Sequence, residues 1–244
     1  MRYLPILILA ATVGCGAEEL APAETTSAEL DGTNPNPMLY RKDARPFGRS
    51  LERWSELLWS YIYAQPFDNN PNFDTTGADC AIGQGGPVWF LPAVPGSTLG
   101  TDIQRSCTIP RQEAIMQQMS SLLNDYPCPD PNFQPAPGQS LYDFLIEPVL
   151  PLFDGETGFV VTLDGVAIVE PLSYRFTSDD LFYFRGDPTM QQFDPCVTGQ
   201  RQPAVSDGFF LMFKPMSPGQ HTIIIQGHDM QGVPVTLTQH LTIQ

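Results

Sequence analysis

Hydrophobic positions follow a helical period in three parts of the chain. The clearest lies between residues 51 and 63, where the apolar side chains fall on one stripe. Ser50 is a suitable N-cap and Pro66 stops the run, so we predict a helix between them. Similar spacing predicts a helix over residues 114–123 and a short one over 141–146. The first stripe consists of Trp54, Leu57, Leu58, Tyr61 and Ile62.

Strand-like runs fill much of the remainder, especially beyond residue 158. They are short, rich in β-branched and aromatic residues, and bounded by turn formers. Asp164-Gly165 between two of these runs predicts a tight hairpin turn. The expected strands are residues 86–91, 105–109, 159–163, 166–169, 173–176, 208–213, 221–225 and 234–243.

The last of these runs alternates between apolar and polar positions. Val235, Leu237, Leu241 and Ile243 share one face, and the residues between them are polar. One buried face and one wet face are typical of a strand in a sandwich. We therefore predict a mainly β protein: a two-sheet antiparallel β-sandwich, immunoglobulin-like or jelly-roll, with added helices in the N-terminal half.

Residues 1–14 contain one positive charge, a short apolar run and small residues, and Cys15 follows. The run is shorter than the roughly 20 residues of a membrane-spanning helix, so it predicts a cleavable leader. Thr12-Val13-Gly14-Cys15 resembles the bacterial lipobox, in which leucine is commoner at the Thr12 position. The resemblance implies a lipid anchor on Cys15, and Gly16 instead of aspartate implies the outer membrane. An ordinary secretory leader is the alternative.

Residues 15–46 show little apolar periodicity and many turn formers. We predict a tether there, between the membrane and a single domain at residues 47–244. The chain carries 12 Lys and Arg against 27 Asp and Glu, a formal net charge of −15. This charge argues against nucleic acid or anionic lipid as a partner, because phosphate binding depends on clustered basic side chains.

Four cysteines follow the leader: Cys80, Cys107, Cys128 and Cys196. An even number in an exported chain favours two disulfides over free thiols. Of the three pairings we favour Cys80–Cys107 with Cys128–Cys196, because sequential pairing closes the shortest loops. A metal site is the alternative, but no C-x-x-C or C-x-x-H spacing is present.

Several motifs, spread over most of the predicted domain, resemble an uncharacterised family of exported bacterial proteins. The resemblance implies export but no particular reaction, because the family has no established activity. After Pro110 the chain departs from the family, whose members continue into an apolar strand ending in Asn and an acid. The segment from Pro218 to Ile243 is also similar to the closing hairpin of bacterial immunoglobulin-like sandwiches. The family motifs include Trp54 and Trp59, Asp74-Thr75-Thr76-Gly77 with Cys80, Gly86-Pro87-Val88-Trp89-Phe90-Leu91, and Ser217-Pro218-Gly219-Gln220-His221-Thr222-Ile223.

The loop over residues 68–79 offers oxygen atoms at the spacing of a calcium-binding helix-loop-helix loop. Phe73 stands where the sharp turn needs glycine, so we favour a polar loop rich in Asx turns. We expect no cofactor, with calcium as the alternative. The candidate calcium ligands are Asp68, Asn70, Asn72, Asp74, Thr76 and Asp79.

Histidine offers a weaker metal hypothesis, through His221, His228 and Asp229 or through His240. None of these residues lies at a tight metal-binding spacing, so we favour ordinary strand and turn positions for them.

No convincing catalytic set is present. The chain has no G-x-S-x-G elbow and no Gly-rich phosphate loop. We therefore favour a lipid-anchored envelope protein with a binding role toward a glycan or protein. One alternative is a secreted hydrolase of saccharides or peptides, with Asp74, Asp79, Gln84 and Trp89 in its cleft. Another is a calcium-dependent adhesion module.

Overall fold

The computed structural model of the protein describes residues 34–229 and 231–244. The predicted leader, the candidate lipidation site Cys15 and residues 16–33 of the predicted tether lie outside the described residues. One compact unit spans Asn34–Gln244. Residues 34–46, which the sequence assigns to the tether, belong to this unit: Leu39 is fully buried and forms a β-bridge with Phe213.

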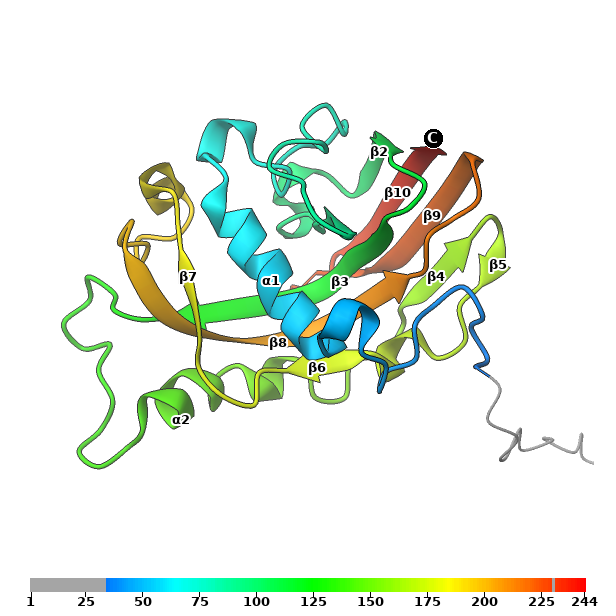
Figure 1. The fold of residues 1–244 in the computed structure, drawn as a ribbon. Coiled ribbons are helices and arrows are strands. Elements are labelled where there is room, and N and C mark those ends of the chain that lie inside the picture. The colour runs from blue at the N-terminus through cyan, green and yellow to red at the C-terminus, as the bar shows by residue number, and fades with distance from the viewer. Residues whose placement is uncertain (1–33, 230) are drawn as a thin grey trace, which may run out of the picture. The chain divides into compact units, whose positions relative to one another are not determined.

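The unit is a two-sheet β-sandwich, which confirms the predicted fold class (Figure 1). The first sheet has the order β1-β3-β8-β6, with β7 also paired to β8, and the second has the order β2-β10-β9-β4-β5. The first comprises β1 (Val88–Leu91), β3 (Ala114–Asp125), β6 (Arg175–Thr177), β7 (Phe182–Arg185) and β8 (Arg201–Phe213). The second comprises β2 (Asp102–Ile109), β4 (Val160–Leu163), β5 (Val166–Ala167), β9 (Gly219–His228) and β10 (Pro234–Ile243).

Both sheets differ from the purely antiparallel arrangement that we expected. β1 runs parallel to β3, and β2 runs parallel to β10, while the other pairs are antiparallel. Parallel neighbours need a long connection. Most of the domain lies between β2 and β10 in the sequence, and the β2 strand itself lies between β1 and β3, so the chain provides both connections.

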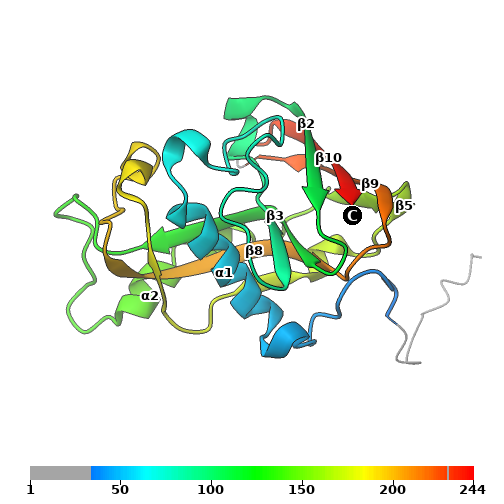
Figure 2. The ribbon, with the colours of Figure 1, turned by 45° about the horizontal axis from the view of Figure 1, so that its top comes forward.

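Helix α1 (Leu51–Ala64) is the predicted helix, and its N-cap is confirmed. The Ser50 hydroxyl accepts a hydrogen bond of 3.2 Å from the Arg53 backbone N–H. The helix lies across β3 and β8 in both views (Figures 1 and 2). Its buried face, including Leu58 and Ile62, belongs to one hydrophobic core with residues of both sheets. Helix α1 is therefore part of the central packing.

The shorter helices complete the framework. α2 (Leu141–Ile146) was also predicted, and it packs against Val205 of β8 through Leu145 and Ile146. In the described part of the chain, 3-10 helices lie in the connections at Pro46–Gly48, Phe67–Asn69, Gly96–Leu99, Leu150–Leu152, Pro171–Ser173 and Pro188–Gln192.

The helix predicted over residues 114–123 is wrong, because this segment is the long strand β3. Its apolar residues match a helical period, but every residue from Ala114 to Met119 is buried. A run that is covered on both faces loses the alternation by which an exposed strand is recognised. Pairing with β1 on one side and β8 on the other then decides the conformation.

Two disulfides connect the loops to the sheets. Cys80 is bonded to Cys107 of β2, and Cys128 is bonded to Cys196. Both of the pairings that we favoured are confirmed. The Asp164-Gly165 turn between β4 and β5 is confirmed as well, since both residues have the positive φ that such a turn requires.

Candidate ligand-binding cavity

A cavity of about 390 Å³ opens where α1, β3 and the β9–β10 hairpin meet. Ordinary small-molecule sites occupy about 300–1,000 Å³, so this volume is at the lower end of that range. Residues from α1, the loop 93–98, β3, β9 and β10 contribute to its wall. The cavity therefore exists only after both sheets and the helix have packed together.

A β-bulge in β3 shapes one wall. Pairing with β8 is regular up to Gln118 and resumes at Ser120, so Met119 is the additional residue. All six residues from Gln118 to Leu123 line the cavity. In a regular strand successive side chains alternate between faces, so a wall built from six consecutive residues depends on the bulge.

Gly208 makes this bulge sterically feasible. It lies opposite Ser121 in β8, with a φ of +147°. A Cβ atom at Gly208 would lie 2.2 Å from the Ser121 Cβ and 2.4 Å from the Ser120 carbonyl oxygen. Only glycine permits this close approach of the two strands.

The cavity wall is mainly apolar. Met119 and Leu123 come from β3, Ile225 from β9 and Leu237 from β10, and Phe159 covers one side. Such a lining favours a ligand with an apolar body, because each Å² of apolar surface removed from water stabilises the complex by about 25 cal/mol.

Two polar side chains in the wall have no partner. Asn72 is 4% exposed, and its side-chain amide forms no hydrogen bond with any described residue. Trp59 of α1 is 6% exposed, and its Nε1–H has no acceptor among the described residues. Buried polar groups are nearly always hydrogen-bonded, so two unpaired groups in one wall indicate a place for a ligand or ordered water.

The cavity rim carries charged groups that are already partnered. His228 Nε2 lies 3.0 Å from Glu156 Oε1 and 3.2 Å from the Thr157 carbonyl oxygen. The Asp229 carboxylate accepts the backbone N–H groups of Gln231 and Val233, both at 2.9 Å. No Lys or Arg is among the described residues that line the cavity.

Tyr63 lines the cavity, and the carboxyl groups of Asp194 and Asp125 lie beyond it. The Tyr63 hydroxyl donates a 2.9 Å hydrogen bond to Asp194. Asp125, at the end of β3, is 3% exposed and accepts a hydrogen bond from Gln202. Burial raises the pKa of Asp125 to about 7, the charge of Asp194 raises it further, and the Gln202 bond only partly opposes this. Asp125 therefore changes its charge near neutral pH.

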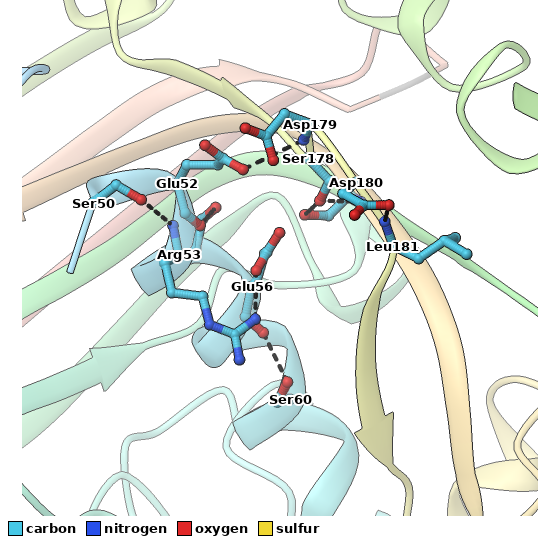
Figure 3. Close-up of polar contacts among 11 residues, drawn as sticks. Ser50, Glu52, Arg53, Glu56, Ser60, Ser178, Asp179, Asp180 and Leu181 are labelled. Atoms are coloured by element: carbon cyan, nitrogen blue, oxygen red, sulfur yellow. Dashed lines mark hydrogen bonds and ion pairs between the residues drawn. The ribbon is translucent and has the colours of Figure 1, made fainter. Parts of the chain in front are cut away.

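A second acidic cluster lies on the N-terminal half of α1 and the loop before β7 (Figure 3). Glu52 accepts a 3.3 Å hydrogen bond from the Asp179 backbone N–H, and burial raises its pKa to about 6. Burial also raises the pKa of Glu56, and its bond to Arg53 opposes this. Carboxyl groups of this kind suit general acid–base chemistry, but none of these side chains lines the cavity.

Of the four residues proposed for a hydrolase cleft, Asp74 and Gln84 hold loops together through their side chains. Asp74 accepts hydrogen bonds from the backbone N–H groups of Thr76 and Asp79, at 2.7 and 2.9 Å. Burial alone would raise the pKa of Asp74, and these N–H groups lower it below its usual value. Gln84 bonds to both the N–H and the carbonyl of Phe90, and Trp89 is buried nearby in the same strand. None of the four lines the cavity.

The candidate calcium ligands face different surroundings. Asn70 donates to the Ile62 carbonyl at 2.8 Å below the end of α1, whereas Asn72 lines the cavity. Asp68 is exposed, and Thr76 bonds to Asp74. The structure therefore brings Asn72 alone of this set to the cavity.

The described residues contain one group of three or more His, Cys, Asp or Glu side chains with ligand atoms within 4.8 Å of one another. It consists of Asp125, Cys128 and Cys196, and its two sulfur atoms are joined in a disulfide. A disulfide sulfur is not a thiolate and does not serve as an ordinary metal ligand.

The three histidines are dispersed. His221 Nδ1 lies 2.7 Å from Asp164 across the β4–β9 pair. Burial lowers the pKa of His221, but its bonds to Asp164 and to Ser217 outweigh this and leave the pKa raised. His228 lies at the cavity rim, and His240 is exposed on β10.

Comparison with known proteins gives no indication of function, so a functional proposal has to be based on the cavity. No protein-family model matches the chain, and no curated protein matches it. Among solved structures, the solution structure of amebosin matches 59% of this chain and 96% of its own length, at 12% identity and a TM-score of 0.21. A TM-score this low carries no argument about fold or function. Within the described part of the chain, no helix has the length and apolar character to cross a membrane.

Four of the wall residues were noticed in the sequence for other reasons: Trp59, Asn72, His228 and Asp229. Asn72 was a candidate calcium ligand, and Trp59 belongs to one of the motifs that resemble a family of exported bacterial proteins. His228 was a candidate metal ligand. The β3 wall was missed, because residues 118–123 were assigned to a helix. The two adjacent serines, Ser120 and Ser121, inside an apolar run were the available signal for an irregular strand.

Proposed function

We propose that the protein is a binding protein that holds a small, largely apolar molecule in the cavity between its sheets. The observation that carries this proposal is the combination of an apolar wall with two unpartnered buried polar groups, Asn72 and Trp59. Ligand sites generally combine an apolar lining with a few polar groups that orient the ligand. The predicted lipid anchor at Cys15 would hold this cavity close to the outer membrane.

The sequence led us to expect a binding role toward a glycan or protein, whereas the proposed site is a cavity for a small molecule. Glycan binding uses many hydrogen-bonding groups, whereas most of the surface of this wall is apolar. The hydrolase and the calcium-dependent adhesion module receive less support, because Asp74 and Asp79 bond within their own loop and do not reach the cavity.

Binding can be tested with N-phenyl-1-naphthylamine, an uncharged dye whose emission rises in apolar surroundings. The dye is excited outside the tryptophan band and titrated with protein whose disulfides are intact. Leu122 lines the cavity, so Leu122→Trp should fill it and lower the dye affinity at least tenfold. Val160 of β4 is 49% exposed, and Val160→Trp serves as the matched control with unchanged binding. Absence of binding to the wild type, or equal binding by both variants, would overturn the proposal.

A further inference from the structure

We propose that the ligand of this cavity carries an uncharged headgroup, such as a primary amide or hydroxyl, which Asn72 and Trp59 recognise. This inference rests on the proposed function and names the class of molecule that the site takes. It also distinguishes that class from fatty acids and cationic amphiphiles, which have similar apolar bodies.

Asn72 offers both kinds of hydrogen-bonding atom to a ligand. Its amide contains one carbonyl acceptor and two N–H donors, and none is used within the described structure. Asn70, two residues earlier, shows the structural use of the same side chain. Its Nδ2 donates to Ile62 at 2.8 Å, and its Oδ1 accepts from the Asn72 backbone N–H at 3.0 Å. The fold of the loop therefore needs the side chain of Asn70 but not that of Asn72.

Trp59 restricts the headgroup further. The indole Nε1–H donates and never accepts, so its partner on the ligand is an oxygen or another acceptor. A headgroup with an oxygen and an N–H or O–H has a complementary atom for the indole N–H and for each function of the Asn72 amide. Amides and alcohols meet this requirement, and a quaternary ammonium does not.

The charges around the cavity disfavour an ionised headgroup. No Lys or Arg lines the cavity, so a carboxylate or phosphate would be buried without a counter-charge. Asp229 is the one acid among the described residues that line the cavity, and its carboxylate accepts hydrogen bonds from its own turn. A cation would therefore find no unengaged acid there.

Arg105 is the buried cation nearest along the second sheet, and it is not part of the wall. It is paired in register with Gln239, two positions beyond the wall residue Leu237 on β10. Its Nη1 donates to the Pro92 carbonyl at 2.8 Å, while Nε and Nη2 have no acceptor among the described residues. Because Arg105 does not line the cavity, strong carboxylate binding is the result that would contradict an uncharged headgroup.

The size of the cavity limits the apolar part. At about 390 Å³ it suits a single chain or one small ring system, not a diacyl lipid. The polar groups lie in the wall of the same cavity, so the headgroup and the apolar body are bound together.

The experiment compares four competitors that share one chain: decanamide, decanol, decanoate and decyltrimethylammonium. Each displaces the dye from the mature protein above neutral pH, where decanoate is ionised. We expect decanamide and decanol to bind at least tenfold more tightly than the two charged compounds. In Asn72→Leu the preference for decanamide over decanoate should fall about fivefold, since one net hydrogen bond is lost. Trp59→Phe, which keeps a ring but removes the N–H, should weaken decanamide and decanol in the same way.

The matched control is Asn69→Leu, which changes the same residue type at an exposed position in the same loop. It should leave all four affinities unchanged. If decanoate binds as tightly as decanamide, or if Asn72→Leu and Asn69→Leu behave alike, the headgroup class is wrong while the cavity remains a binding site. If the dye itself does not bind, the proposed function fails first, so the two failures are distinguishable.

Discussion

Replacing Asn72 by leucine should make the protein more stable while it weakens ligand binding. Leucine has the same branching as asparagine, and the cavity beside position 72 can accept its bulkier methyl groups, which would extend the apolar wall. The substitution removes no hydrogen bond of the side chain, because the Asn72 amide has none within the described structure. The backbone N–H of Asn72 still donates to Asn70.

The magnitude follows from the state of the amide. An unsatisfied buried polar group costs about 1–3 kcal/mol. Asn72 faces a cavity that water can enter, so the lower end applies and we expect about 1 kcal/mol of stabilisation. For a domain that spans Asn34–Gln244, this corresponds to a rise in Tm of about 2–4 °C. Affinity for an amide ligand should fall about fivefold at the same time.

The assay is thermal and urea unfolding followed by circular dichroism, without ligand. Asn70→Leu is the opposite case, because it removes the side chain that donates to the Ile62 and Gln65 carbonyls and accepts from the Asn72 N–H. It should lower the stability by about 2 kcal/mol or more. A fall in stability for Asn72→Leu comparable to that of Asn70→Leu would refute the reasoning, because Asn72 would then be a structural residue.

Two further substitutions test the surroundings of the cavity. Between pH 3.8 and about 7, Asp125 is protonated in the folded protein and ionised in the unfolded chain. The free energy of unfolding of the wild type should therefore fall as pH rises through this window, by up to about 4 kcal/mol. Asp125→Asn should remove most of this fall in urea unfolding across the window, and an unchanged slope would contradict the cause. Gly208→Ala should cost about 3 kcal/mol in the same assay, because its Cβ would collide with Ser121. Gly219→Ala, at a similar φ with open space around it, should cost clearly less, and equal costs would show that the bulge tolerates a side chain.

Local signals predicted the elements that depend on local physics. The apolar stripe with Ser50 before it and Pro66 after it specified α1, and the Ser50 cap is in place. The Asp164-Gly165 pair specified its hairpin, because the positive φ of both residues belongs to that turn. The alternation in residues 234–243 likewise matched β10. Each of these patterns is complete within about fifteen residues of sequence.

Elements whose conformation depends on distant partners were not predicted. Residues 114–123 are apolar at a helical period, and they become β3 because β1 and β8 pair with both of their edges. Strand β7 (Phe182–Arg185) is absent from the strands expected from the sequence, although its residues alternate between buried and exposed. Four residues give too short a pattern to be recognised without the neighbour β8.

The candidate cavity was beyond prediction for a related reason. Its wall combines residues from Trp59 to Leu237, and the contribution of β3 depends on one additional residue, Met119. No spacing rule connects such positions. Asn72 attracted attention only because a loop full of Asn and Asp suggests a cation, and the sequence cannot distinguish a bonded amide from one that faces a cavity.

Several features that cost stability gather around one site. A bulge interrupts the longest ladder of the first sheet, Gly208 is held at a positive φ to permit it, and Asn72 and Trp59 leave polar atoms unpaired beside it. Asp74, which first suggested chemistry, has its hydrogen bonds satisfied by its own loop. Trp89, Arg105 and Gln117 also carry unpaired buried atoms away from the cavity, so the coincidence of bulge, glycine and unpaired groups distinguishes this site. Natural sequences depart from local consistency mainly where function demands it. The bulge, Gly208 and the unpaired groups together are therefore a stronger functional signal than the many carboxylates of an acidic protein.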